Sequence, residues 1–174
     1  AHVEVRIGDA MDLPIESGCV LGQVAGADAL AVQETTGDCP MTVGESVPVH
    51  ANGLSTCLEG RIAYEGDTEM LPFALFQRLA ASGFHSVVIV PLMAESKFFG
   101  ALLVARRARD AFRSTDCEFL QQLGEHVALA AQQAQLYGAL QQAYDDLRQT
   151  QATVLQQERL RALGQMASGI AHDI

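Results

Sequence analysis

The strongest hydrophobic pattern in the chain lies between residues 86 and 105. Two apolar runs, Ser86–Leu92 and Phe98–Ala105, flank the polar segment Ala94–Lys97. Their β-branched and aliphatic residues favour strands, and a short polar link between two strands predicts an antiparallel hairpin. Neither run alternates apolar with polar residues, which indicates strands covered on both faces. We therefore expect this hairpin at the centre of a sheet, with helices against both sides.

A helix is predicted before the hairpin. Phe73, Phe76 and Leu79 recur on one helical face. Pro72 suits the first helical position, and Gly83 suits a left-handed C-terminal cap, so we expect about three turns.

The first 71 residues carry weaker signals, because turn-forming residues separate short apolar runs. Val3–Ile7 alternates as a half-buried strand does, and Val47–Val49 and Arg61–Tyr64 also fit strand pieces. A short helix is expected over Gly53–Glu59.

The chain changes character after Arg113, since no proline and only four glycines follow. Thr115-x-x-Glu118 fits a capping box, so one long helix is expected from there. A polar helix of about 60 residues is not stable alone and needs a partner helix.

Apolar residues on this helix form a stripe with alternating spacings of three and four, as in a coiled coil. The first run is Tyr137, Leu140, Tyr144, Leu147, Gln151 and Val154, and the second is Leu160, Leu163, Ala167, Ile170 and Ile174. The runs are out of phase, so the register breaks between Val154 and Leu160. One stripe on one chain predicts a parallel homodimer.

Composition narrows the partners. The chain is 49% hydrophobic and 18% charged, which is typical of a globular domain, and its net charge is −10. Without a basic cluster, nucleic acid and anionic membranes are disfavoured, which leaves small molecules and proteins. No membrane span or signal peptide is visible, so we expect a cytoplasmic location, although a longer parent protein could carry an anchor elsewhere.

The four cysteines are scattered at positions 19, 39, 57 and 117, without a CxxC pair. This spacing argues against a metal site and favours reduced thiols.

Three segments resemble the second half of a GAF domain: Ala81–Leu92, Phe98–Gly100, and Phe112–Asp116 ahead of a long helix. The resemblance implies an α+β fold with an antiparallel sheet flanked by helices and a small-molecule pocket on one face. It places a GAF-like sensory domain over residues 1–138, followed by a coiled-coil signalling helix over 139–157.

Residues 158–174 resemble the H-box that opens the dimerisation and phosphoacceptor domain of histidine kinases. The resemblance implies that His172 accepts the γ-phosphoryl group of ATP and that Asp173 helps to take its proton. The chemistry agrees, because neutral imidazole is a nucleophile near pH 7 and a neighbouring carboxylate can accept a proton. With Ala167 and Ile170 at positions a and d, His172 falls at the outward position f.

No ATP-binding domain or Gly-rich phosphate loop is present. We therefore expect this chain alone to be inactive and to belong to a longer kinase that uses ATP and Mg²⁺. A response-regulator receiver domain is the expected phosphoryl acceptor.

The sequence does not identify a ligand for the GAF pocket. The candidate haem ligands or bilin attachment points are His50, Cys57, His85 and His126, but none forms a Cys-His pair, which favours structural or surface roles. The sequence motif of GAF domains that bind cyclic nucleotides is also absent.

The leading hypothesis is a sensor-kinase segment that relays a change in the GAF domain to His172. The alternative is a GAF domain that binds no small molecule and serves as a dimerisation or interaction module. An output domain of the cyclase, phosphodiesterase or transcriptional class is disfavoured by the H-box.

Overall fold

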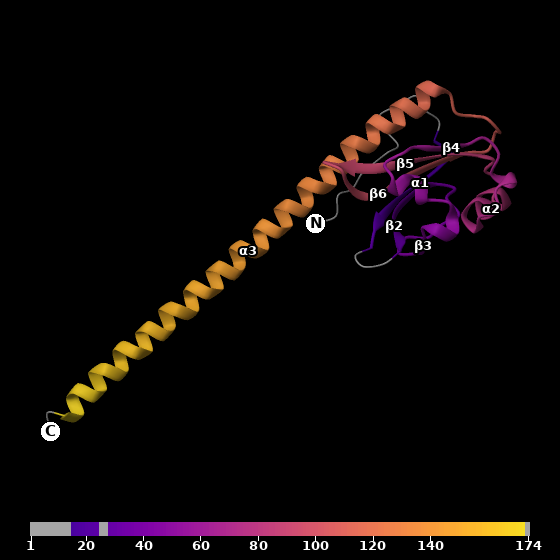
Figure 1. Ribbon diagram of the computed structural model, residues 1–174. Helices are drawn as coiled ribbons and strands as arrows, with labels where there is room; N and C mark the ends of the chain where they lie inside the picture. The colour runs from indigo at the N-terminus through magenta and orange to yellow at the C-terminus, as the bar shows by residue number, and fades with distance from the viewer. Residues whose placement is uncertain (1–14, 25–27, 173–174) are drawn as a thin grey trace. The chain divides into compact units, whose positions relative to one another are not determined.

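The computed structural model describes residues 15–24 and 28–172, without the side chains of residues 162 and 164–172. The strand expected over Val3–Ile7 lies outside the described residues. The described chain forms a six-stranded antiparallel sheet in the order β3-β2-β1-β6-β5-β4, flanked by helices (Figure 1). The expected α+β fold is confirmed.

The elements follow one another along the chain as strands interrupted by short helices, and one long helix follows the last strand. The strands are β1 (Ser17–Gln23), β2 (Ala29–Gly37), β3 (Ser46–Pro48), β4 (Ala63–Glu65), β5 (Ser86–Ala94) and β6 (Lys97–Arg106). The helices are η1 (His50–Asn52), α1 (Ser55–Leu58), η2 (Thr68–Met70), α2 (Ala74–Ala81) and α3 (Ser114–His172).

The hairpin predicted from the apolar runs is β5 and β6, and both strands lie inside the sheet. They are joined by a two-residue turn, Glu95 and Ser96, in which both residues have positive φ (48° and 64°). Two left-handed residues suit the twist of a tight hairpin. The link is therefore shorter than the four-residue segment seen in the sequence, because Ala94 and Lys97 still pair in the ladder.

Both faces of the sheet are covered, as expected. Along β5, Val87 and Ile89 join one apolar cluster with α1 and α2, whereas Val88 and Val90 join a second cluster with α3. We call these the α1/α2 face and the α3 face. Successive side chains of a strand point to opposite faces, so this strand must be apolar throughout.

The first part of α3 lies close against the sheet. Leu120, Gly124 and Ala128 are buried and four positions apart, which places them on one side of the helix. A Cβ added to Gly124 would lie 2.7 Å from Cγ1 of Val90. The missing side chain thus permits the close packing of α3 on β5.

The part of α3 from Gln133 on is a separate compact unit. Its described side chains are exposed almost throughout, including the large apolar residues of the stripe. No other part of the chain that the structure describes packs against that stripe.

Helix α2 differs from its prediction at the start. It begins at Ala74, two residues after Pro72, and spans eight residues instead of about three turns. Phe73 is still extended, and the side-chain oxygen of Asn52 accepts a hydrogen bond from the backbone N–H of Leu75 at 2.8 Å. A distant residue therefore caps the helix. The left-handed Gly83 after the helix is confirmed, with φ of 82°.

The start of α3 also differs. The capping box predicted from Thr115 and Glu118 is wrong. The carboxylate that accepts a backbone N–H at the start of the helix is that of Asp116, and the donor is the N–H of Arg113 at 3.2 Å. The helix begins one residue earlier, at Ser114, so the acidic residue in the third helical position is Asp116.

Strands β1 and β2 were not identified from the sequence, although β1 lies beside β6 at the centre of the sheet. A bulge between Val20 and Leu21 interrupts the pairing of β1 with β2. Strand β4 begins two residues later and ends one residue later than the segment Arg61–Tyr64 expected for it.

Candidate functional site

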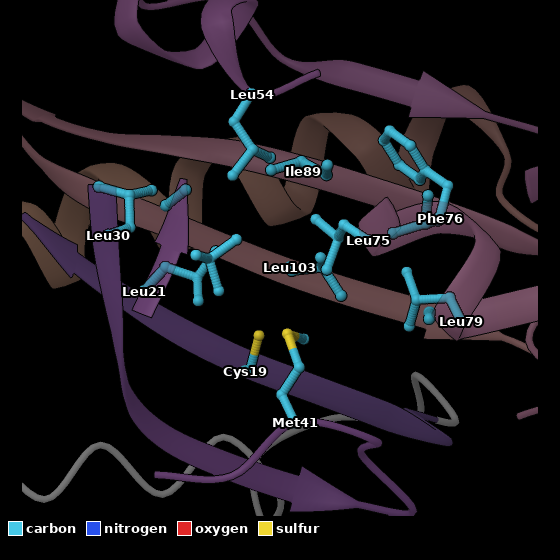
Figure 2. Close-up of a cluster of buried hydrophobic side chains, with 14 of the residues drawn as sticks. Cys19, Leu21, Leu30, Met41, Leu54, Leu75, Phe76, Leu79, Ile89 and Leu103 are labelled. Carbon is cyan, nitrogen blue, oxygen red and sulfur yellow. The ribbon is translucent and has the colours of Figure 1, made fainter. Parts of the chain in front are cut away.

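The α1/α2 face is filled by apolar side chains from both the sheet and the helices (Figure 2). Leu21 and Leu103 come from the central strands, Leu75 and Leu79 come from α2, and Leu54 comes from the short segment between η1 and α1. All five are at most 4% exposed. The polar groups that could recognise a ligand on this side therefore come from its rim.

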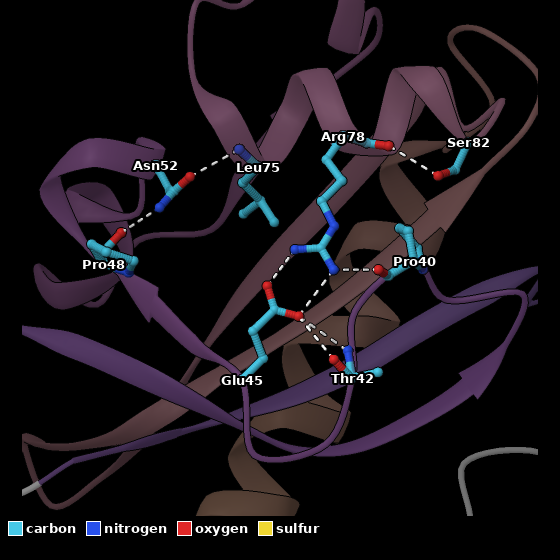
Figure 3. A network of polar contacts seen from close by, with 8 residues as sticks. All are labelled: Pro40, Thr42, Glu45, Pro48, Asn52, Leu75, Arg78 and Ser82. Atoms are coloured by element: carbon cyan, nitrogen blue, oxygen red, sulfur yellow. Dashed lines mark hydrogen bonds and ion pairs between the residues drawn. The ribbon is translucent and has the colours of Figure 1, made fainter.

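A groove of about 200 Å³ lies on this rim between β3 and α2. It is lined by Met41, Glu45, Ser46, Val47, Pro48, Asn52, Ala74, Leu75 and Arg78. Asn52 is only 6% exposed, and its amide is engaged at both ends, by the carbonyl of Pro48 at 2.8 Å and by the N–H of Leu75 (Figure 3). Its first role is therefore to join η1 to α2.

The charged pair of the rim is Arg78 and Glu45 (Figure 3). Both terminal nitrogens of Arg78 donate to the carboxylate, one of them at 2.9 Å, and Arg78 also donates to the carbonyl of Pro40. Hydrogen bonds from Arg78 lower the pKa of Glu45 to about 2, with help from the N–H of Thr42 and against the effect of burial. The pair ties the β2–β3 connection to α2.

A second polar site lies where the sheet meets α3. The Arg106 guanidinium donates to Asp116 at 3.0 Å and to the carbonyl of Ala111 at 2.6 Å, and it lies 4.4 Å from the centroid of the Phe112 ring. The side chains of Arg106 and Asp116 are 10% and 16% exposed. Largely desolvated charged hydrogen bonds are strong, so this junction fixes the start of α3 to the end of β6.

The four ligand candidates from the sequence are not brought together. His50 is exposed beside Ser55 and Asp28, and Cys57 is buried in α1 with its sulfur 3.9 Å from the carbonyl of Ile89. His85 lies 3.4 Å from Glu69, and His126, an exposed residue of α3, lies 2.7 Å from the Gln122 carbonyl. Within the described residues no cluster of three or more His, Cys, Asp or Glu side chains could hold a metal ion.

The predicted phosphoacceptor lies at the far end of α3. His172 is the last residue of the helix, and its side chain is not described; Asp173 lies outside the described residues. The backbone is helical without interruption from Ser114 to His172. Their predicted roles remain predictions.

Sequence reasoning missed the Arg78–Glu45 and Arg106–Asp116 pairs. Each joins residues from different elements, and neither has a local sequence pattern. Arg106 carried one signal in the sequence, because it directly follows the apolar run Phe98–Ala105. In the fold it is 8% exposed. A charge at the end of such a run must find a partner.

Comparison with known proteins identifies the class. Residues 11–131 match the GAF domain family, and the chain belongs to that family. No curated protein matches it. The GAF domain of a two-component sensor histidine kinase from Bacillus halodurans is similar in structure, with a TM-score of 0.62, 21% identity, and coverage of 72% of this chain and 87% of that one.

Two further solved structures show how widely this fold is used. One is the GAF domain of a phosphoenolpyruvate-protein phosphotransferase from Coxiella burnetii, with a TM-score of 0.63, 14% identity, and coverage of 72% and 77%. The other is a type II free methionine-R-sulfoxide reductase from Thermoplasma acidophilum, with a TM-score of 0.55, 17% identity, and coverage of 66% and 77%. At such identities the likeness establishes the fold alone.

Over the residues that the structure describes, no helix is both long and apolar enough to cross a membrane.

Proposed function

We propose that this chain is the sensory and dimerisation segment of a two-component sensor histidine kinase. The observation that carries the proposal is the continuity of α3, which is fixed to the sheet by Asp116 and runs without a break to His172. A change in the GAF domain that moves the start of this helix would be carried along a stiff element. The fold shared with a GAF domain of a sensor histidine kinase supports the proposal.

The partner of the second half of α3 is a second copy of this chain. Seven large residues of the stripe are between 47% and 73% exposed: Tyr137, Leu140, Tyr144, Leu147, Val154, Leu160 and Leu163. Their spacing suits a parallel coiled coil, and an isolated helix of this composition would be unstable in water.

The chemistry is phosphoryl transfer. A neutral imidazole nitrogen of His172 attacks the γ-phosphorus of ATP, the bond to the bridging oxygen breaks, and ADP leaves. Asp173 accepts the imidazole proton, and the phosphohistidine then donates its phosphoryl group to the receiver domain of a response regulator. ATP and Mg²⁺ are supplied by the kinase domain of the longer protein.

The test is phosphorylation of the longer protein by ATP and Mg²⁺. His172→Gln should abolish acid-labile, alkali-stable phosphorylation, and Asp173→Asn should slow it by about 10²- to 10⁴-fold. His126→Gln is the matched control, since His126 is an exposed histidine on the same helix. It should be phosphorylated like the wild type. Undiminished phosphorylation of His172→Gln would overturn the proposal.

A second candidate, a GAF dimerisation module without a small ligand, is favoured by the filled α1/α2 face. Native mass spectrometry of the purified protein distinguishes the two. A retained small-molecule mass supports sensing of a ligand, and a bare protein mass supports the module.

A further inference from the structure

Three polar side chains from separate parts of the chain meet beside η1. His50 is the first residue of η1, Ser55 is the first residue of α1, and Asp28 directly precedes β2. One ring nitrogen of His50, Nδ1, lies 3.0 Å from the hydroxyl oxygen of Ser55. The other ring nitrogen, Nε2, lies 3.6 Å from a carboxylate oxygen of Asp28. The imidazole therefore lies between a hydroxyl and a carboxylate.

Backbone hydrogen bonds hold the three residues together. The N–H of Val49 donates to the carbonyl of Asp28 at 3.2 Å, which joins the start of β2 to the residue before His50. The N–H of Leu54 donates to the carbonyl of Val49 at 3.1 Å, which closes the loop between His50 and Ser55. Val49 and Leu54 are at most 2% exposed. His50 and Ser55 thus each follow a residue that is anchored in the core.

The loop between His50 and Ser55 is also fixed to α2. Gly53 has a φ of 70°, and a Cβ added to it would lie 2.8 Å from the ring of Phe73, which precedes α2. Asn52 accepts the N–H at the start of α2 and donates to the end of β3. The backbone therefore sets the spacing of the imidazole and the hydroxyl, as a preorganised site requires.

This order of groups is one that activates a serine. A serine hydroxyl is a weak nucleophile until a neighbouring base takes its proton, and a third group commonly orients that base. When the imidazole proton is on Nε2, facing Asp28, Nδ1 of His50 can accept the proton of Ser55. The distance from Nε2 to Asp28 exceeds that of a usual hydrogen bond, so the carboxylate acts mainly through its charge.

We propose that Ser55, His50 and Asp28 form a nucleophilic triad that hydrolyses small activated carboxylic esters through an acyl-serine intermediate. The Ser55 oxygen attacks the carbonyl carbon while its proton moves to Nδ1 of His50. The bond from that carbon to the alcohol oxygen then breaks, and the alcohol leaves with the proton from His50. Water attacks the acyl-serine and gives a proton to His50. The ester bond to Ser55 breaks, the serine oxygen takes that proton back, and a carboxylic acid is released.

The exposure of the triad limits its substrates and its rate. The side chains of His50 and Asp28 are 68% and 63% exposed, and Ser55 is partly exposed. Water can therefore reach the acyl-serine, and an ester needs no deep pocket to reach Ser55. Because water also screens the charges, the rate enhancement belongs at the low end of the range for general bases, and the ester needs a good leaving group. The inference is independent of the proposed kinase role, since none of the three residues lies on α3.

The first experiment uses the full chain and p-nitrophenyl acetate at pH 7. A burst of p-nitrophenol that matches the amount of protein should precede slower steady release, as expected when an acyl-enzyme accumulates. After an acid quench, mass spectrometry of the peptides should place the acetyl group on Ser55. Acetyl groups found only on lysines or on His50 would overturn the proposal.

The second experiment separates the nucleophile from the base. Ser55→Ala should abolish the burst, and His50→Gln should slow it about 10²-fold. The controls are Ser82→Ala, which removes a partly exposed hydroxyl that donates to the carbonyl of Arg78, and His126→Gln, which removes an exposed imidazole. Both should keep the wild-type burst. A burst that survives in Ser55→Ala and is lost in His50→Gln would mean that the imidazole reacts alone, which contradicts the triad.

The third experiment tests Asp28 as a positioning residue. Asp28→Ala should lower kcat for p-nitrophenyl acetate several-fold and leave KM unchanged, because Asp28 contacts His50 and not the ester. Asp28→Glu keeps the carboxylate and should recover most of the rate. Both variants should melt like the wild type, since the side chain is exposed. A wild-type kcat in Asp28→Ala, or a loss in Asp28→Glu as large as that in Asp28→Ala, would show that the carboxylate has no part in the triad.

Discussion

The guanidinium of Arg106 and the carboxylate of Asp116 lie 3.0 Å apart where the last strand of the sheet meets α3. The same carboxylate accepts the N–H of Arg113 and so caps the helix. One side chain therefore both starts α3 and holds it to β6. In the proposed relay, this pair is the mechanical connection between the GAF domain and the helix that carries His172.

Breaking this pair should destabilise the GAF domain. Asp116→Asn leaves the largely buried Arg106 without its counter-charge, which should lower the free energy of unfolding by about 1 to 3 kcal/mol in a urea titration. Arg109→Met is the control, because Arg109 is 51% exposed and its pairs with Asp67 and Glu69 are screened by water. An Asp116→Asn variant as stable as the control would contradict the role given to the junction.

The position of the core can be tested with Val88. Its side chain is fully buried in the cluster of the α3 face, and an unpaired carboxylate there costs several kcal/mol, against a typical total stability of about 5 to 15 kcal/mol. Val88→Asp should therefore not fold, as judged by the loss of cooperative thermal unfolding. Val43→Asp makes the same chemical change at a residue that is 64% exposed, and it should melt like wild type. A cooperative melt of Val88→Asp would show that the core is misplaced.

The Arg78–Glu45 pair predicts a pH dependence. Because the pKa of Glu45 is lowered to about 2 in the folded chain, and is about 4.3 when unfolded, its contribution to stability is present above the unfolded value. It is lost as the pH falls toward 2. Glu45→Gln should lower stability by about 1 kcal/mol at pH 7, since both groups are partly exposed, and by less at pH 3.

The control for this prediction is Glu59→Gln, which removes a more exposed carboxylate paired with Arg61. Thermal melts at both pH values should show little effect of that change. If Glu45→Gln had the same effect at pH 3 as at pH 7, the pair would not be the cause.

The homodimer predicted from the stripe can be tested by light scattering. Leu140→Lys combined with Leu147→Lys places unpaired charges in an apolar seam and should shift the protein toward monomer. Gln141→Ala changes a neighbouring exposed residue and should leave the mass unchanged. A wild-type protein that light scattering shows to be a monomer at tens of micromolar would contradict the dimer.

Elements that are determined by a local sequence pattern were predicted. Element boundaries and contacts that depend on residues far apart in the sequence were not. Strands β5 and β6 could be predicted because both of their faces are buried. Almost every residue in them is therefore apolar, and the run stands out in the sequence. Helix α2 was found from Phe76 and Leu79, but its start was wrong because the cap comes from Asn52, 23 positions away from Leu75. Strands β1 and β2 escaped notice because a bulge and several polar residues interrupt their pattern.

The same reason limits prediction of the sites. The Arg106–Asp116 and Arg78–Glu45 pairs join residues of different elements, and only the folded chain brings them together. The prediction for His172 rests on a contiguous motif in the sequence, so it was made without knowledge of the fold, and it stays a prediction.

The most direct test of the relay is the rate of His172 phosphorylation in the longer protein when the rotational phase of α3 is changed. Duplicating Leu140–Asp146 adds one heptad and changes the phase by only about 20°, whereas inserting two residues after Arg148 turns the rest of the helix by about 200°. If the helix relays the signal through its phase, the heptad variant should be phosphorylated at close to the wild-type rate, and the two-residue variant should not. Equal, wild-type rates in both variants would contradict it.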